Sequence, residues 1–152
     1  VDQIINKFRI YYDEVGWKKS TPYEGVFDVL EYMSKSKINQ YIVTNKPHKV
    51  TKLILAFFEL DRYIQDVICP DMDIPYSRTK RDMLSFVLEK HRIINGDAIY
   101  VGDTQSDARA AYQCGLSFGA AQYGYGNFSG MEEEFPTIYL SKITDLMTIL
   151  KQ

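Results

Sequence analysis

Residues 98–107 read Ala98-Ile99-Tyr100-Val101-Gly102-Asp103-Thr104-Gln105-Ser106-Asp107, and this stretch decides the fold. Its first four residues form an apolar run that predicts a buried β-strand, and Gly102 ends the strand. Two carboxylates, Asp103 and Asp107, follow at the point where the backbone turns into a helix. Ligands of open α/β sheets bind at the carboxyl ends of the strands. We therefore expect a functional site in this loop.

Outward from this stretch, short apolar runs alternate with helical periods along the chain. Further strands are predicted at 41–44, 67–69, 118–121 and 137–140. Each of four predicted helices is expected to face the core with four apolar residues. In chain order these are Val26, Phe27, Leu30 and Met33; Val50, Leu53, Ile54 and Phe57; Met83, Leu84, Val87 and Leu88; and Ile143, Leu146, Met147 and Leu150. Repeated βα order predicts an α/β fold, a three-layer α/β/α Rossmann-like core with a mostly parallel sheet.

Helix boundaries are also visible in the sequence. Residues 21–24, Thr-Pro-Tyr-Glu, match a capping box with proline at the first helical position. Pro47 is expected to open the next helix, and Gly115 to end the helix that begins near Ser106. These signals predict where each helix enters and leaves the sheet.

Composition limits the classes of protein to consider. The 152 residues, 45% of them hydrophobic and 25% charged, are enough for one compact domain. The net charge of -2 and the scattered Lys and Arg residues exclude a basic surface for nucleic acid. No apolar run is long enough to span a membrane, and Cys69 and Cys114 lack zinc-ligand spacing. We expect a soluble, cytoplasmic protein with two buried, reduced thiols.

The pair Asp103 and Asp107 is suited to a metal ion. Magnesium takes oxygen ligands and is usually held by one or two carboxylates, water and substrate phosphate. Helix capping would explain either acid alone, because Asp and Ser are common at helix starts. It does not explain both acids after a buried strand.

Two other segments could bind phosphate. Thr44-Asn45-Lys46-Pro47 offers a hydroxyl, an amide and backbone N–H groups at a helix start, although the same residues are ordinary helix punctuation. Lys80, near the start of a later helix, could neutralise a phosphate, although surface lysines are common. Either signal is weak by itself.

Together these segments resemble the haloacid dehalogenase superfamily, in particular its phosphoglycolate-phosphatase-like branch with a helical cap. Thr44-Asn45-Lys46-Pro47 is similar to the second motif of that family, Lys80 to the third and residues 102–107 to the fourth. The resemblance also includes residues 22–26 and 123–126, and it runs from about residue 8 to the end. Family members often have proline after the lysine, where this chain has Arg81.

The resemblance implies a role for each motif residue. Thr44 would bind the phosphate of the substrate, with Asn45 helping to position it, and Lys80 would stabilise charge on the transferring phosphoryl group. Asp103 would act on a Mg²⁺ cofactor directly or through water, and Asp107 would support it. The implied substrate is a small phosphorylated metabolite, which leaves sugar phosphates, nucleotides and other phosphomonoesters open.

The family's first motif, an apolar strand ending in Asp-x-Asp, has no counterpart before Thr44. Its first aspartate is the nucleophile and its second the acid and base. Residues 1–20 look instead like a remnant of the cap and its return linker, followed by a core domain over 21–152. Asp71-Met72-Asp73 has the local pattern but stands between the second and third motifs, beside Pro70 and Pro75, as in an ordinary turn.

Two main hypotheses follow. The first is a phosphatase of this superfamily whose chain lacks its N-terminal portion, and with it the nucleophile and the first strand of the sheet, through truncation, a split gene or cleavage. The second is a non-catalytic relative that binds phosphate, metal or a protein. A purely structural module would make no use of the acidic pair. A missing first strand would leave an open sheet edge that favours a homo-oligomer or a complementing N-terminal segment.

Overall fold

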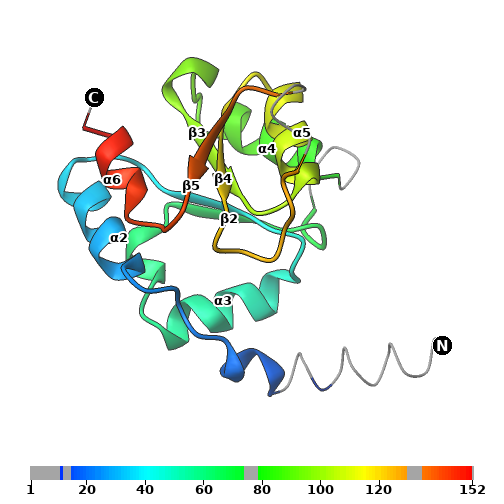
Figure 1. Cartoon of the computed structure of the whole chain (residues 1–152). Helices are drawn as coiled ribbons and strands as arrows, with labels where there is room; N and C mark the ends of the chain where they lie inside the picture. Colours follow the sequence, from blue (N-terminus) through cyan, green and yellow to red (C-terminus); the bar gives the residue numbers. More distant parts are fainter. Residues whose placement is uncertain (1–10, 12–14, 74–78, 130–134, 152) are drawn as a thin grey trace.

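Every strand pairing within the described residues is parallel, and a helix lies between successive strands except the last two (Figure 1). The structure is a computed structural model that describes residues 11, 15–73, 79–129 and 135–151. In chain order the elements are η1 (Gly16–Lys19), α2 (Val26–Lys35), β1 (Tyr41–Val43), α3 (His48–Phe57), η2 (Asp61–Tyr63), β2 (Asp66–Ile68), α4 (Lys80–Lys90), η3 (Asn95–Asp97), β3 (Ile99–Gly102), α5 (Gln105–Gln113), β4 (Ser117–Ala121), β5 (Thr137–Leu140) and α6 (Asp145–Ile149). The predicted α/β class is confirmed.

The strands form two sheets in the described part of the chain, where the sequence predicts one. One sheet has the order β1-β2 and the other β3-β4-β5. Strands β1 and β3 therefore each pair on one side only within the described residues. The hydroxyl of Tyr100 on β3 lies 3.5 Å from the carbonyl oxygen of Val43, so the two strands end close together. The two sheets thus share one edge of polar loops.

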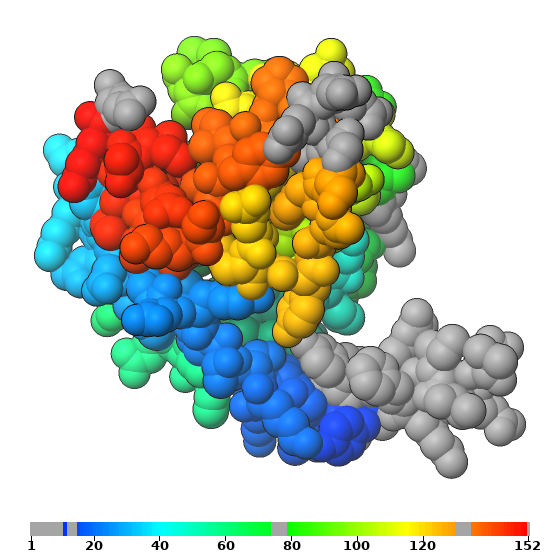
Figure 2. Space-filling view, viewed as in Figure 1, coloured from blue at the N-terminus to red at the C-terminus, as the bar shows by residue number. Residues whose placement is uncertain are grey.

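Helices cover both faces of the strands. Helices α4 and α5 pack against Tyr41, Val43 and Tyr100, which lie on one face. The opposite face carries Ile42, packed under α3, and Ile99, packed under α2 and α6. Side chains of successive strand residues thus alternate between the two helical layers, as the geometry of a strand requires. In Figure 2, α6 (red) and α2 (light blue) lie side by side on the viewed face.

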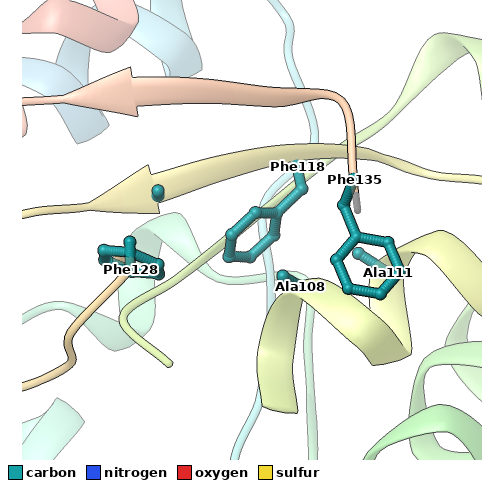
Figure 3. Close-up of a cluster of buried hydrophobic side chains, with 6 residues drawn as sticks. Ala108, Ala111, Phe118, Phe128 and Phe135 are labelled. Atoms are coloured by element: carbon teal, nitrogen blue, oxygen red, sulfur yellow. The ribbon is translucent and has the colours of Figure 1, made fainter. Parts of the chain in front are cut away.

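An aromatic core fills the space between α5 and the larger sheet. Phe118 on β4 contacts Phe128 and lies in one buried cluster with Phe135 and the small residues Ala108 and Ala111 of α5 (Figure 3). The alanine side chains leave room for the rings. Burial of each phenylalanine contributes about 1.5–3 kcal/mol. This core fixes α5, and with it the loop of residues 102–107, on the sheet.

Burial confirms the inward face of α4 and corrects one predicted position of α2, Phe27. All four residues predicted to face inward on α4 are buried. In α2 the buried residue is Val29, while Phe27 is 43% exposed. The predicted capping box at 21–24 is wrong, because α2 begins only after Gly25, which has φ of 81° and lies against Thr144. That turn sets the phase of the helix.

The inward face of α3 is also shifted. Val50 is buried as predicted, but Leu53 and Phe57 are exposed, whereas Thr51 and Leu55 are buried. Thr51 can occupy the inner face because its hydroxyl donates to the carbonyl oxygen of Pro47 at 2.9 Å. A polar residue with a satisfied hydroxyl is therefore part of this interface.

Cys69 and Cys114 are free and buried, as predicted. No helix within the described residues is long and apolar enough to cross a bilayer. The predicted cap remnant and return linker at 1–20 are described only at residues 11 and 15–20. The division at residue 20 stays a prediction; in the described part of that segment, Trp17 is buried and packs edge-on against Phe57 at 5.6 Å.

A charged cluster joins the end of α4 to the start of β2. Asp66 Oδ2 lies 2.7 Å from the Lys90 ammonium and 2.8 Å from His91 Nε2, and the ring of Tyr41 lies 4.7 Å from that of His91. Burial opposes ionisation of Asp66, but the hydrogen bonds from Lys90 and His91 outweigh it and lower the pKa of this carboxyl group. The cluster should therefore stabilise the fold when Asp66 is ionised.

Replacing Asp66→Asn should lower the free energy of unfolding at pH 7 by about 1 kcal/mol, because it removes the charge that Lys90 and His91 contact. A carboxyl group with a lowered pKa contributes its stability above the ordinary pKa of aspartate, about 3.9, and loses it as the pH falls further. Urea unfolding at several pH values would measure this difference. The exposed Asp61→Asn is the matched control, and a loss in Asp66→Asn that did not shrink as the pH fell below about 3.9 would contradict the assignment.

Candidate functional site

The carboxylate of Asp107 is the most heavily hydrogen-bonded side chain of the candidate site. Asp107 lies in the first turn of α5 and is only 7% exposed. Its Oδ2 accepts from the Thr104 backbone N–H at 3.2 Å and from the Thr104 hydroxyl at 2.7 Å. The Thr104 hydroxyl in turn accepts the Asp107 N–H at 3.1 Å. This capping box fixes the start of α5.

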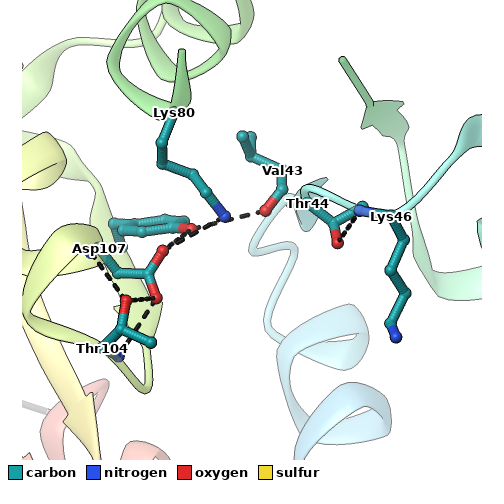
Figure 4. Close-up of polar contacts among 7 residues, drawn as sticks. Val43, Thr44, Lys46, Lys80, Thr104 and Asp107 are labelled. Carbon is teal, nitrogen blue, oxygen red and sulfur yellow. Dashed lines mark hydrogen bonds and ion pairs between the residues drawn. The ribbon is translucent and has the colours of Figure 1, made fainter. Parts of the chain in front are cut away.

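The other oxygen of Asp107 faces the second helix of the same layer. Its Oδ1 lies 3.2 Å from the ammonium of Lys80, the first residue of α4, and accepts from the Tyr100 hydroxyl at 3.2 Å. Figure 4 shows Lys80 extending between Asp107 and the end of β1. Burial and the nearby charge of Asp107 raise the pKa of Tyr100 well above its usual value. The tyrosine therefore stays protonated and acts as a donor.

Asp103, the other predicted acidic residue, is half-buried and is held by a different loop. Its Oδ2 accepts the backbone N–H of Tyr125 at 3.1 Å. The flanking residues Gly124 and Gly126 pack so close that a Cβ on Gly126 would overlap the Asp103 carbonyl oxygen. Oδ1 of Asp103 has no hydrogen-bond partner among the described residues. One carboxylate oxygen is thus fixed and the other is available.

Aromatic side chains flank this loop. The rings of Tyr23 and Tyr123 meet edge-on with centroids 4.9 Å apart, and Tyr125 is 97% exposed. Burial, with nearby charge that includes Asp103, raises the pKa of Tyr123 to about 12. Tyr123 is therefore neutral at ordinary pH.

Thr44 lies directly beyond β1, next to the residue that Tyr100 contacts. Its hydroxyl oxygen accepts the Lys46 N–H at 3.2 Å, and its own N–H donates to the Ile68 carbonyl at 3.1 Å. Asn45 is exposed. The structure brings Lys80 and Asp107 into contact and places Asp103 in the same loop as Asp107, with Thr44 at the neighbouring strand end.

Asp71 has a structural role. Both of its carboxylate oxygens accept the backbone N–H of His48, at 2.9 and 3.1 Å, and so cap the first turn of α3. This contact joins the loop after β2 to the helix after β1. The sequence favours the interpretation of Asp71-Met72-Asp73 as part of an ordinary turn. The capping contact of Asp71 supports this interpretation, because it gives the acid a structural role.

A magnesium site would have one available carboxylate here. Within the described residues, no group of three or more His, Cys, Asp or Glu side chains could hold a metal ion. Asp107 already accepts from Lys80, Tyr100 and Thr104. Asp103 has a free oxygen, and Mg²⁺ in proteins often takes one carboxylate with water and phosphate oxygens. The donor set fits that kind of coordination.

Three contributors to the site were not identified from the sequence: Tyr100, Thr104 and the N–H of Tyr125. Thr104 could have been found, because Thr-x-x-Asp matches the spacing of a capping box. Tyr100 appeared only as one apolar residue of a strand. The Tyr125 contact involves backbone and joins positions 22 residues apart, so no local pattern indicates it.

Comparisons with known proteins identify the relatives of this chain. The family model described as haloacid dehalogenase-like hydrolase matches residues 1–121. Phosphoglycolate phosphatase 1 of Pseudomonas aeruginosa is 31% identical over 130 residues, which cover 86% of this chain and 47% of the relative. Phosphoglycolate phosphatase of Photobacterium profundum is 28% identical over 144 residues, which cover 95% of this chain and 62% of the relative. The chain thus spans about half to three-fifths of these relatives.

Solved structures show the same fold. A predicted phosphatase from Clostridium acetobutylicum superposes with a TM-score of 0.85 at 26% identity, and the match covers 97% of this chain and 68% of that one. A haloacid dehalogenase-like family hydrolase from Streptococcus pneumoniae gives a TM-score of 0.85 at 21% identity, with 98% and 69% of the two chains covered. The second likeness concerns the fold alone.

Replacing Gly126→Ala should displace the loop at 124–126, because the added methyl group would overlap the Asp103 carbonyl oxygen. Loss of the hydrogen bond from Tyr125 to Asp103 should speed hydrogen exchange of the Tyr125 amide about tenfold. Exchange measured by NMR would test this, with Gly96→Ala as control because no atom lies within 4 Å of its added methyl position. Equal exchange rates in the two variants would refute the described packing.

Proposed function

The chain belongs to the haloacid dehalogenase-like hydrolases, and from this premise we propose that it supplies the phosphate-binding and metal-binding part of a phosphatase for small phosphomonoesters. The observation that carries the proposal is the position of the Lys80 ammonium, 3.2 Å from Asp107 and beside the end of β1. A partly exposed cation near the strand ends is suited to an incoming phosphate.

Thr44 and Lys80 are proposed to hold the phosphoryl group. The hydroxyl oxygen of Thr44 already accepts from Lys46, so its proton is available to donate to a phosphate oxygen. Asn45 is exposed beside it and can add an amide donor. Lys80 carries the positive charge that stabilises negative charge on the transferring group. Because Asp107 fixes Lys80, the ammonium needs little rearrangement when phosphate arrives.

Asp103 is proposed as the carboxylate ligand of Mg²⁺ through Oδ1, the oxygen left free by Tyr125. A bound Mg²⁺ would supply positive charge against the phosphate oxygens. Asp107 supports this arrangement through its hydrogen bond with Thr104 and its ion pair with Lys80. Asp103 and Asp107 thus have different tasks, one toward the metal and one toward the protein.

The aspartate nucleophile is proposed to lie outside these 152 residues. The sequence contains one Asp-x-Asp, at 71–73, and Asp71 is engaged in capping α3. A complementing strand that carries the nucleophile could pair with β1 and β3, each of which pairs on one side only within the described residues. A second copy of the chain is the other candidate for these edges.

The substrate and the setting are inferred from the relatives and the thiols. Two relatives are named phosphoglycolate phosphatases, so a small phosphorylated acid is the first substrate class to test. The buried free Cys69 and Cys114 fit a reducing compartment, the cytoplasm. The alternative function is a non-catalytic protein that binds phosphate or metal, which the engagement of Asp71 favours for the chain alone.

Asp103→Asn should weaken Mg²⁺ binding by about tenfold or more, because it removes the charged ligand while the Tyr125 contact can persist. Isothermal titration with Mg²⁺ in the presence of inorganic phosphate would measure the affinity. Asp97→Asn is the matched control, since Asp97 is an exposed acid before β3. Equal affinity in both variants would remove Asp103 from the metal site.

Hydrolysis of an aryl phosphate by the same preparations separates the two functions. The 152-residue chain alone should show no Mg²⁺-dependent turnover, because the proposed nucleophile is not part of it. Turnover that Asp103→Asn abolishes would contradict this placement of the nucleophile and make Asp73 the next residue to replace. Mg²⁺ binding without turnover, even when the N-terminal portion is supplied, would favour the non-catalytic alternative.

A further inference from the structure

A groove of about 600 Å³ lies between the start of α4 and the outer side of α5. Its volume is within the range of small-molecule sites, roughly 300–1,000 Å³. The lining residues are Thr79, Lys80, Arg81, Asp82, Ser106, Arg109, Ala110 and Gln113. Apart from Ala110, all of these side chains are polar or charged. Such walls are suited to a charged ligand rather than an apolar one.

Two arginines give the groove its positive charge. Arg81 and Arg109 are exposed, and neither forms an ion pair with any residue that the structure describes. Asp82 is the one acidic residue of the lining, and its Oδ2 accepts the Thr79 hydroxyl at 2.6 Å. The ammonium of Lys80 is directed to Asp107. The two guanidinium groups are therefore the cations available to a ligand.

A second groove on this chain provides a contrast. It measures about 400 Å³ and also contains cations, Lys35 and Arg62. There Lys35 lies 2.7 Å from Glu31, and Arg62 donates to the Tyr63 hydroxyl at 2.9 Å. The cations of the smaller groove already have partners within the protein. In the larger groove Lys80 is paired with Asp107, whereas Arg81 and Arg109 form no ion pair within the described residues.

The larger groove adjoins the candidate active site at Lys80 and extends away from it along α5. On α5 the lining residues Ser106, Arg109 and Gln113 recur at helical spacing on one side of the helix. Asp107 lies on another side and is buried against Lys80. A ligand in the groove would therefore contact the outer side of α5, whereas Thr44 and Asp103 lie at the strand ends.

We propose that Arg81 and Arg109 form a second anion site, which binds the phosphate group of a small metabolite in the groove beside α5. A guanidinium group matches the geometry of phosphate through paired N–H donors. Ser106 and Gln113 line the same groove and add neutral donors. The site does not depend on the proposed phosphatase function, since no residue of the proposed catalytic set other than Lys80 lines it.

NMR titration of the 152-residue chain with inorganic phosphate, without Mg²⁺ and at constant ionic strength, tests the proposal. Backbone amides of residues 106–113 should shift and saturate. In the double variant Arg81→Gln/Arg109→Gln the dissociation constant reported by these amides should rise at least about tenfold. Arg62→Gln, which removes one positive charge from the smaller groove, should leave it unchanged.

Each contrary outcome is decisive. No saturable shift at 106–113 in the unaltered chain would overturn the proposal, and so would equal binding in the double variant. If Arg62→Gln weakened phosphate binding as much as the double variant, binding would depend on the overall charge of the protein rather than on this groove, which would also overturn the proposal. Because both arginines are exposed, unchanged spectra elsewhere would confirm that the double variant is folded. If the proposed active site does not bind phosphate, the amides of residues 44–46 and 103 should show no saturable shift, whatever happens at 106–113.

Discussion

The carboxylate of Asp107 is the contact on which the site depends. A nearly buried charge must be paired and hydrogen-bonded to be tolerated. Asp107 meets this condition by accepting from Thr104, Tyr100 and Lys80, which belong to the start of α5, to β3 and to α4. Through the Tyr100 hydroxyl the same cluster reaches Val43 at the end of β1. One ionised group thus positions the loops of both sheets.

Sequence patterns predicted the elements better than their detailed faces. Helix α4 is simple to predict because it packs between both sheets and α5, so its four apolar positions have one way to face. The buried face of helix α3 includes Thr51, whose hydroxyl donates to the carbonyl oxygen of Pro47. The phase of α2 follows from the turn at Gly25. Tertiary contacts therefore decide which side of each helix is buried, and the hydrophobic periodicity of the sequence does not reveal these contacts.

The acidic loop was identified from its position after a strand, but the division of labour within it was not. Asp103 and Asp107 are chemically identical in the sequence. They differ because Asp107 is surrounded by donors, while Asp103 has one oxygen free. In the same way, Asp71 resembles a catalytic acid locally, yet it caps a helix 23 positions away in the sequence. Sequence spacing indicates which residue types lie near one another. The hydrogen-bond partners of each oxygen atom can be identified only from the folded structure.

A double-mutant cycle on Lys80 and Asp107 tests this account most directly. Lys80→Met, Asp107→Asn and the double variant would be compared by the free energy of unfolding in urea. The account predicts a coupling energy of about 2 kcal/mol or more, because each single change leaves a nearly buried charge without its partner. Additive effects within about 0.5 kcal/mol would contradict it, since Asp107 would then not hold Lys80 at the site.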